Sequence, residues 1–139
     1  MIDFVEGPLV EIREKSIIVR SEIFGYEIFV SKQVIEDFKT RKPGDTSLIR
    51  LFIFVYKVEA YDRLYGFATQ VEREIFTELR KTDGVGPTTA MAILSLGSAK
   101  EIAGAIRRAD WRFFAEVRGM KEVKAKRIIL DLAKHYSEF

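Results

Sequence analysis

Residues Thr82-Asp83-Gly84-Val85-Gly86-Pro87-Thr88-Thr89 lie between two segments of helical apolar periodicity. Gly84 and Gly86 can adopt positive φ or let another backbone approach closely, and Val85 between them can pack back against the helices. Pro87 suits the first turn of a following helix. The stretch therefore predicts a helical hairpin. The free N–H groups of its second helix, at the positive end of the helix dipole, would form a binding site for a phosphate.

A short corner between helices that binds nothing is the alternative, because glycine-rich corners of this kind are common. A second copy of the pattern favours the binding hairpin. Gly84, Val85, Ala90, Ile93 and Leu94 recur, at one constant interval, as Gly119, Met120, Ala125, Ile128 and Ile129. The sequence thus predicts a tandem helix-hairpin-helix, with its second hairpin around residues 117–121.

Composition limits the class of protein. The chain has 139 residues, 47% of them apolar, which suffices for one core or two small ones packed directly together. Its longest apolar runs, such as residues 51–56, are too short to span a membrane, and no signal segment opens it. It has no cysteine and a single histidine, His135, so we expect no disulfide, metal or cofactor, and a cytoplasmic location.

The net charge of +2 is unevenly divided. Residues 1–66 carry 10 Lys/Arg against 11 Asp/Glu, and residues 67–139 carry 13 against 10, which gives −1 and +3. The positive excess lies in the half that holds the hairpins, as a phosphate-binding surface requires, although solvated surface charge would give a similar difference.

Residues 1–66 alternate as half-buried strands do, with pairs such as Ile2 and Phe4 at period two and turn signals at Gly7-Pro8, Lys15-Ser16 and Gly25. A helical turn at 31–38 and a long strand at 47–56 follow. Five short strands predict an OB-fold barrel, with an SH3-like barrel as the rival. From residue 67 to 139 the period becomes helical, so the predicted fold is α+β, a barrel followed by an all-helical domain.

The residues expected to contact DNA flank the two hairpins. They are Lys81, Gly84, Val85, Gly86, Pro87, Thr88, Thr89, Arg118, Gly119, Met120, Lys121 and Lys124, and Arg80 also lies nearby. For each cation the alternative is an ordinary solvated side chain. Glu59 and Asp62, at the predicted turn near residues 58–62, are either ordinary turn residues or carboxylates that repel phosphates and separate strands.

Enzymatic chemistry is not supported. Lys81-Thr82-Asp83-Gly84 matches the Lys-x-Asp-Gly pattern of nucleotidyl transfer, but the chain has no room for the nucleotide-binding domain that this reaction needs. It also lacks a phosphate-binding loop for ATP, a recognisable catalytic triad and a metal-ligand cluster.

Four short segments point to a known family: Leu64-Tyr65-Gly66-Phe67, residues 81–87 (KTDGVGP), residues 90–95 (AMAILS) and Gly25-Tyr26-Glu27. Through them the sequence resembles, over essentially the whole chain, the RuvA family of Holliday-junction-binding proteins. The resemblance implies a homotetramer, or an octamer on DNA, that holds a four-way junction open for branch migration. It also implies that each subunit grips DNA through both hairpins, that Glu59 matches the first carboxylate of an acidic pin, and that the ATPase RuvB is a partner.

The sequence departs from this family in three places. Lys121 replaces the second glycine of the second hairpin, and Ala60 replaces the second pin carboxylate, with Asp62 as a compensating acid. The family continues into a third, RuvB-binding domain that we expect to be absent. Two other hypotheses stay open: an OB and helix-hairpin-helix fragment of an NAD-dependent DNA ligase, and a generic structure-specific DNA adaptor.

Overall fold

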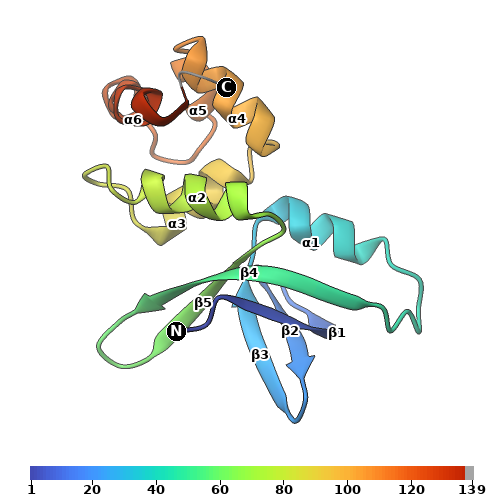
Figure 1. The fold of residues 1–139 in the computed structure, drawn as a ribbon. Coiled ribbons are helices and arrows are strands. Elements are labelled where there is room, and N and C mark those ends of the chain that lie inside the picture. The colour runs from blue at the N-terminus through green and yellow to red at the C-terminus, as the bar shows by residue number, and fades with distance from the viewer. Residues whose placement is uncertain (137–139) are drawn as a thin grey trace. The chain divides into compact units, whose positions relative to one another are not determined.

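The structure, a computed structural model, describes residues 1–136 (Figure 1). The strands are β1 (Phe4–Ile12), β2 (Ser16–Ser21), β3 (Phe24–Phe29), β4 (Leu48–Lys57) and β5 (Asp62–Phe67). The helices are α1 (Lys32–Lys39), α2 (Gln70–Leu79), α3 (Pro87–Leu94), α4 (Ala99–Arg107), α5 (Trp111–Phe114) and α6 (Glu122–Tyr136). The chain forms two compact units, residues 1–73 and 74–139, and the boundary falls within α2.

The first unit is a closed barrel with the strand order β1-β2-β3-β5-β4, in which β4 pairs back with β1. Neighbouring strands are antiparallel except β3 and β5, which are parallel and align Ile28 with Leu64. The helix α1 connects β3 to β4. This is an OB-like barrel, so the predicted fold class is confirmed, and it is the OB alternative of the two that strand counting left open.

Every second residue of the strands points into the barrel interior. Ile17 and Val19 of β2, Ile28 of β3, and Leu51 and Ile53 of β4 are all almost completely buried. Because successive strand residues point to opposite faces, these positions share the inward face of the sheet. The face of β4 that carries Leu51 and Ile53 is thus the one that meets the barrel interior.

Two of the predicted turn signals in the first strands lie inside strands instead. Gly7 and Pro8 do not form a turn but lie inside β1, where a Cβ on Gly7 would overlap the carbonyl oxygen of Arg20 on β2. Gly7 is needed because the two strands approach closely there. In the sequence alone, such a glycine cannot be distinguished from one that forms a turn. Gly25 lies within β3, and the turn before it contains Glu22, which adopts a φ of 57°.

The inward face of β1 also differs from the expectation. Val5 is buried and Phe4 is exposed, although the alternation grouped Phe4 with the half-buried positions. The Phe4 ring lies instead beneath the guanidinium of Arg50, with Cζ 4.8 Å from the ring centroid. A cation over its face accounts for an aromatic side chain on the outside of the strand.

Several helices begin at a residue whose side chain caps them. The Ser31 hydroxyl accepts the Val34 N–H, and Ser98 with Glu101 forms a complete capping box at α4. The Asp110 carboxylate accepts the Phe113 N–H at 3.3 Å at the start of α5. Each cap supplies an acceptor for an N–H that has no partner within its own helix. None of the helices in the described part of the chain has the length and apolarity needed to cross a membrane.

Candidate nucleic-acid interface

The two hairpins of the second unit share one backbone conformation. In the first hairpin, residues 82–86, the Val85 N–H donates to the Thr82 carbonyl at 3.1 Å. In the second hairpin, residues 117–121, the Met120 N–H donates to the Val117 carbonyl at 3.0 Å. Gly84 and Gly119 adopt φ values of 82° and 79°, in the left-handed region that favours glycine. The hairpins are therefore structural repeats.

The apolar residues of the repeat anchor both hairpins. Burial is matched pair by pair for Val85 and Met120, Ala90 and Ala125, Ile93 and Ile128, and Leu94 and Ile129, none of which is more than 7% exposed. Such burial of apolar side chains stabilises the hairpin against the unit's interior. Any contact that these hairpins make with a ligand at Val85 or Met120 must therefore come from the backbone.

The start of α3 is open. Gly86 is its N-cap residue, in extended backbone with a φ of −91°, and no side chain caps the helix. Gly86 and Thr88 are exposed and Thr89 is half-buried. A Cβ placed on Gly86 would meet no atom within 4 Å, so the fold itself does not require glycine at this position. The first turn thus presents N–H donors and the positive end of a helix dipole to the outside.

Helix α6 of the second repeat lies against the first hairpin. The Thr82 hydroxyl donates to Asp131 Oδ2 at 2.9 Å, and Arg127 Nη2 donates to Asp83 Oδ2 at 3.1 Å. One turn earlier on α6, the Lys124 ammonium lies 3.9 Å from the position of a Cβ on Gly84. Sequence reasoning grouped Lys124 with the second hairpin, whereas the structure brings its charge to the first.

The acidic turn lies in the first unit, between β4 and β5. The Val58 N–H donates to the Tyr61 carbonyl at 3.0 Å and closes it. Asp62 is the first residue of β5, and its carboxylate lies 3.7 Å from the Lys57 ammonium. Glu59 is exposed, and no side chain among residues 1–136 pairs with its carboxylate. Of the two predicted acids, only Glu59 thus presents a carboxylate without a nearby cation.

Comparison with known protein families assigns both parts of the chain. Residues 1–66 match the family described as RuvA N terminal domain, and residues 76–134 match the SAM-like helix-hairpin-helix tandem. The chain is 33% identical to Holliday junction branch migration complex subunit RuvA of Halalkalibacterium halodurans, over 95% of this chain and 63% of that protein. Residues 1–66 thus belong to the RuvA N-terminal domain family. The resemblance seen in the sequence is thereby confirmed, as is the tandem of hairpins.

Other RuvA proteins match to a similar extent. The subunit from Francisella tularensis subsp. mediasiatica is 32% identical and that from Borreliella burgdorferi 30% identical, each over 95% of this chain. The matches cover 59% and 64% of those two proteins. The chain described here thus spans about 60% of the length of the RuvA relatives that it matches.

The cation that precedes the first hairpin is held by a carboxylate that sequence reasoning missed. The Lys81 ammonium lies 2.9 Å from Glu78 Oε1, and His135 Nε2 lies 2.8 Å from Glu78 Oε2. The Glu78 side chain is only 13% exposed, so it is a largely buried acceptor for Lys81 and, when His135 is protonated, for a second cation. Glu78 lies near the end of α2, three residues before Lys81. This spacing favours ion pairs and could have indicated the pair from the sequence.

The second hairpin differs from the first at the start of the helix that follows it. Lys121 stands where the first hairpin has Gly86, and Glu122 opens α6 with an ion pair of 2.8 Å to Lys126. Arg118 and Lys121 are both exposed. This chain therefore has one hairpin with an unobstructed backbone at Gly86 and one with exposed side-chain charges.

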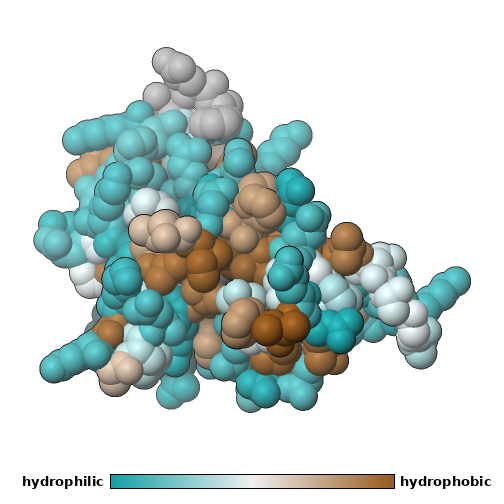
Figure 2. Space-filling model, turned by 60° about the horizontal axis from the view of Figure 1, so that its bottom comes forward, coloured by the Kyte–Doolittle hydropathy of each residue, from teal (hydrophilic) through white to brown (hydrophobic). Residues whose placement is uncertain are grey.

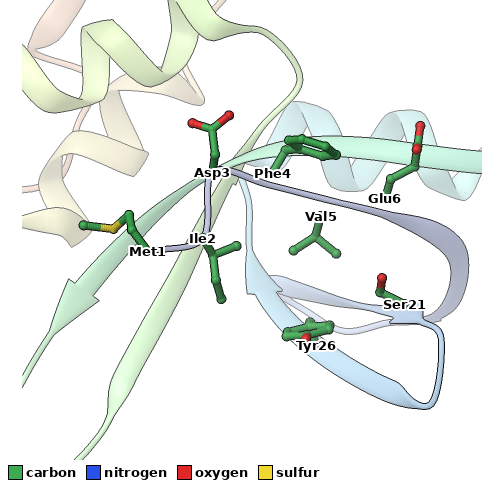
Figure 3. A pocket seen from close by; sticks show the side chains of 8 residues that line it. All are labelled: Met1, Ile2, Asp3, Phe4, Val5, Glu6, Ser21 and Tyr26. Atoms are coloured by element: carbon green, nitrogen blue, oxygen red, sulfur yellow. The ribbon is translucent and has the colours of Figure 1, made fainter.

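The pocket shown in Figure 3 does not have the chemistry of an active site. Met1, Ile2, Asp3, Phe4, Val5, Glu6, Ser21 and Tyr26 line it. Ile2, Val5 and Tyr26 gather in its centre, whereas the Asp3 and Glu6 carboxylates point away from them. These acids lie 2.9 Å from Arg73 and 3.4 Å from Arg50, respectively. Among the described residues, no group of three or more metal-ligating side chains assembles.

Proposed function

We propose that this chain binds four-way DNA junctions through backbone phosphates and carries out no chemical step on them. The observation that carries the proposal is the open start of α3, where Gly86 leaves space above the uncapped helix and Lys124 lies beside Gly84. A phosphate needs N–H donors, positive charge and room for close approach, and this place offers all three. The names of the RuvA relatives support a Holliday junction as the target.

The proposed contacts divide by mechanism. The first hairpin would bind through its backbone N–H groups and the hydroxyls of Thr88 and Thr89, with Lys124 adding charge. Lys81 would add less, because the Glu78 carboxylate lies 2.9 Å from its ammonium. The second would bind mainly through the side chains of Arg118 and Lys121, because Lys121 replaces the glycine. Contacts of this kind read the phosphate backbone and carry little sequence preference. Val85 and Met120 fix the position of each hairpin from below.

We assign Glu59 the role of keeping strands apart at the branch point. Its carboxylate is exposed at the β4–β5 turn, and like charges at close range repel. Asp62 contributes less, because Lys57 lies 3.7 Å away and offsets its charge.

We further propose that the chain assembles as a tetramer, or as two stacked tetramers on DNA. Figure 2 shows apolar side chains gathered in a patch bordered by polar ones. Large apolar side chains exposed in the first unit include Phe4, Ile23, Phe24 and Leu48. Exposed apolar surface of this kind is typical of a face that another protein copy covers. Molar mass in solution, with and without a synthetic junction, tests the assembly: a monomer in both conditions would contradict it.

Binding is tested by fluorescence anisotropy with a four-way junction and a linear duplex of equal length. We expect tighter binding to the junction and a steep loss of affinity with added salt, because each neutralised phosphate contributes a slope of about −0.9 in log K against log salt concentration. Equal affinity for the two DNA forms would overturn the proposal.

The role of the acidic turn is tested with the double variant Glu59→Gln, Asp62→Asn. We expect junction affinity to be kept or raised, because repulsion of phosphates is lost. Energy transfer between dyes on the arm ends should at the same time report a change in junction conformation. An unchanged conformation would remove Glu59 and Asp62 from the proposed mechanism and would favour a generic adaptor.

A further inference from the structure

Tyr61 presents an aromatic ring to solvent at the tip of the β4–β5 turn. The residue is 55% exposed, although its carbonyl closes the turn by accepting the Val58 N–H at 3.0 Å. Large exposed aromatic side chains lose little by being covered and gain much from a flat partner. Tyr61 is thus an exposed ring on a structured turn, beside Glu59 and Asp62.

The ring of Tyr61 is held in place by Arg63. Arg63 Nη2 donates to the Tyr61 hydroxyl at 3.3 Å, and its Cζ lies 5.7 Å from the ring centroid. The same guanidinium lies over the Phe29 ring on β3, with Cζ 4.3 Å from that centroid. A hydrogen bond with Tyr65 raises the pKa of Arg63, so the cation is permanent. Tyr61 is therefore positioned by a charge that the barrel itself fixes.

Behind Arg63 the aromatic contacts continue along the outer face of the sheet, since Phe29 and Tyr65 alternate with residues of the barrel core. The rings of Phe29 and Tyr65 lie 6.0 Å apart between centroids, and those of Tyr65 and Tyr56 lie 6.3 Å apart. Tyr65 is buried. A ring that is supported in this way loses little conformational freedom when a ligand stacks on it, which favours binding.

An exposed, positioned ring with a nearby cation is the arrangement with which proteins stack nucleobases. Every base has a π-face, so the contact needs no particular sequence, and a neighbouring arginine adds attraction. At the branch point of a four-way junction, base pairs end where the strands change partners, so a base there can expose a face. We propose that Tyr61 stacks on a nucleobase at the branch point of the junction, with Arg63 as its positioning residue.

This inference rests on the proposed junction binding and assigns the turn a second, attractive role beside the repulsion by Glu59. The two roles are compatible because the carboxylate acts on phosphates and the ring on a base. Ala60, between the two residues, is exposed and carries no charge that would repel a phosphate.

The test is a double-mutant cycle between the protein and the DNA. Tyr61→Leu keeps an apolar side chain but removes the flat ring, and a junction with abasic sites at the branch point removes the bases on which it stacks. We expect Tyr61→Leu to weaken binding to the intact junction about fivefold or more. The same substitution should have no effect on the junction with abasic branch-point sites, whereas abasic sites placed in the arms should leave its effect unchanged.

Three controls make the cycle decisive. Tyr61→Phe keeps the ring and should bind nearly as the wild type does. Val10→Ala shortens another exposed apolar side chain of the barrel, outside the residues named for assembly, and should not change affinity. An equal loss for Tyr61→Leu on intact and abasic-branch-point junctions, or no loss on either, would overturn the stacking while leaving junction binding intact. Equal affinity of the wild type for junction and duplex would instead overturn the proposed function, and the stacking with it.

Discussion

Thr82 Oγ1 donates a hydrogen bond of 2.9 Å to Asp131 Oδ2, and this bond connects the first hairpin to the last helix, α6. Thr82 is 2% exposed, so its hydroxyl has no access to bulk water. Together with the Arg127–Asp83 ion pair of 3.1 Å, the bond fixes the hairpin relative to the helix that carries Lys124.

We expect Thr82→Val to lower the free energy of unfolding by about 1 kcal/mol, because it removes one buried hydrogen bond while keeping the side-chain shape. Urea unfolding followed by circular dichroism measures the change. Thr82→Ser keeps the hydroxyl and should lose clearly less stability. If the serine variant lost as much as the valine variant, the hydrogen bond would not be the cause.

Substitutions of the hairpin glycines should separate folding from binding. Gly84→Ala and Gly119→Ala each place a Cβ in the left-handed region, and we expect each to lower the free energy of unfolding by roughly 1–2 kcal/mol. Gly86→Ala should leave stability unchanged, because the backbone there is extended and the space is open.

The same Gly86→Ala variant should nevertheless bind a four-way junction about tenfold more weakly, equivalent to about 1.4 kcal/mol, because its methyl group occupies the place of the approaching phosphate. Anisotropy titration measures this loss. Wild-type affinity in Gly86→Ala would show that no phosphate approaches this point.

Lys124→Gln should reduce the salt dependence of junction binding. If the Lys124 ammonium neutralises one phosphate at the first hairpin, removal of its charge lowers the slope of log K against log salt by about 0.9. Lys126→Gln is the matched control, since Lys126 is exposed on the same helix and pairs with Glu122 at 2.8 Å. A similar change of slope in both variants would indicate a general effect of net charge.

Acid should destabilise the barrel partly through Glu27. Its carboxylate accepts the Ser16 hydroxyl at 2.8 Å and Arg13 Nη1 at 2.9 Å, and these bonds lower the pKa of Glu27 below its usual 4.5. A lowered folded-state pKa gives stability that is present above the usual value and is lost as pH falls through the lowered one.

We therefore expect Glu27→Gln to be less stable than the wild type at pH 7, by up to about 1 kcal/mol because the side chain is partly exposed, and to lose less stability between about pH 5 and pH 3. Urea midpoints over this range measure the difference. Glu14→Gln, an exposed change in the neighbouring turn, should follow the wild-type curve, and an identical curve for Glu27→Gln would contradict the assignment.

Local patterns were sufficient to predict the hairpins. The turn at Gly84 and its copy at Gly119 depend on φ > 0 and on apolar residues within a few positions, and both are visible in one sequence. The prediction of a turn at Gly7 was wrong because a glycine that lets a neighbouring strand approach closely and a glycine that forms a turn are the same residue type in the sequence. Nothing local distinguishes them.

The contacts between α6 and the first hairpin could not be predicted from the sequence. Lys124 reaches Gly84 only because α6 packs beside the first hairpin, and that arrangement depends on tertiary contacts far apart in sequence. The position of Tyr61 was likewise hidden, since Arg63 and Phe29 meet only once β3 and β5 pair in parallel.

The crossing of side chains from α6 to the earlier hairpin has a consequence for protein engineering. A duplicated motif is usually treated as two exchangeable modules, yet here the donor of charge and the loop that it serves belong to different copies. If residues 80–95 were grafted onto another scaffold, the graft would contain the hairpin glycines but would lack the ammonium group of Lys124. The smallest transplantable fragment of this chain is therefore the pair of repeats, joined as one.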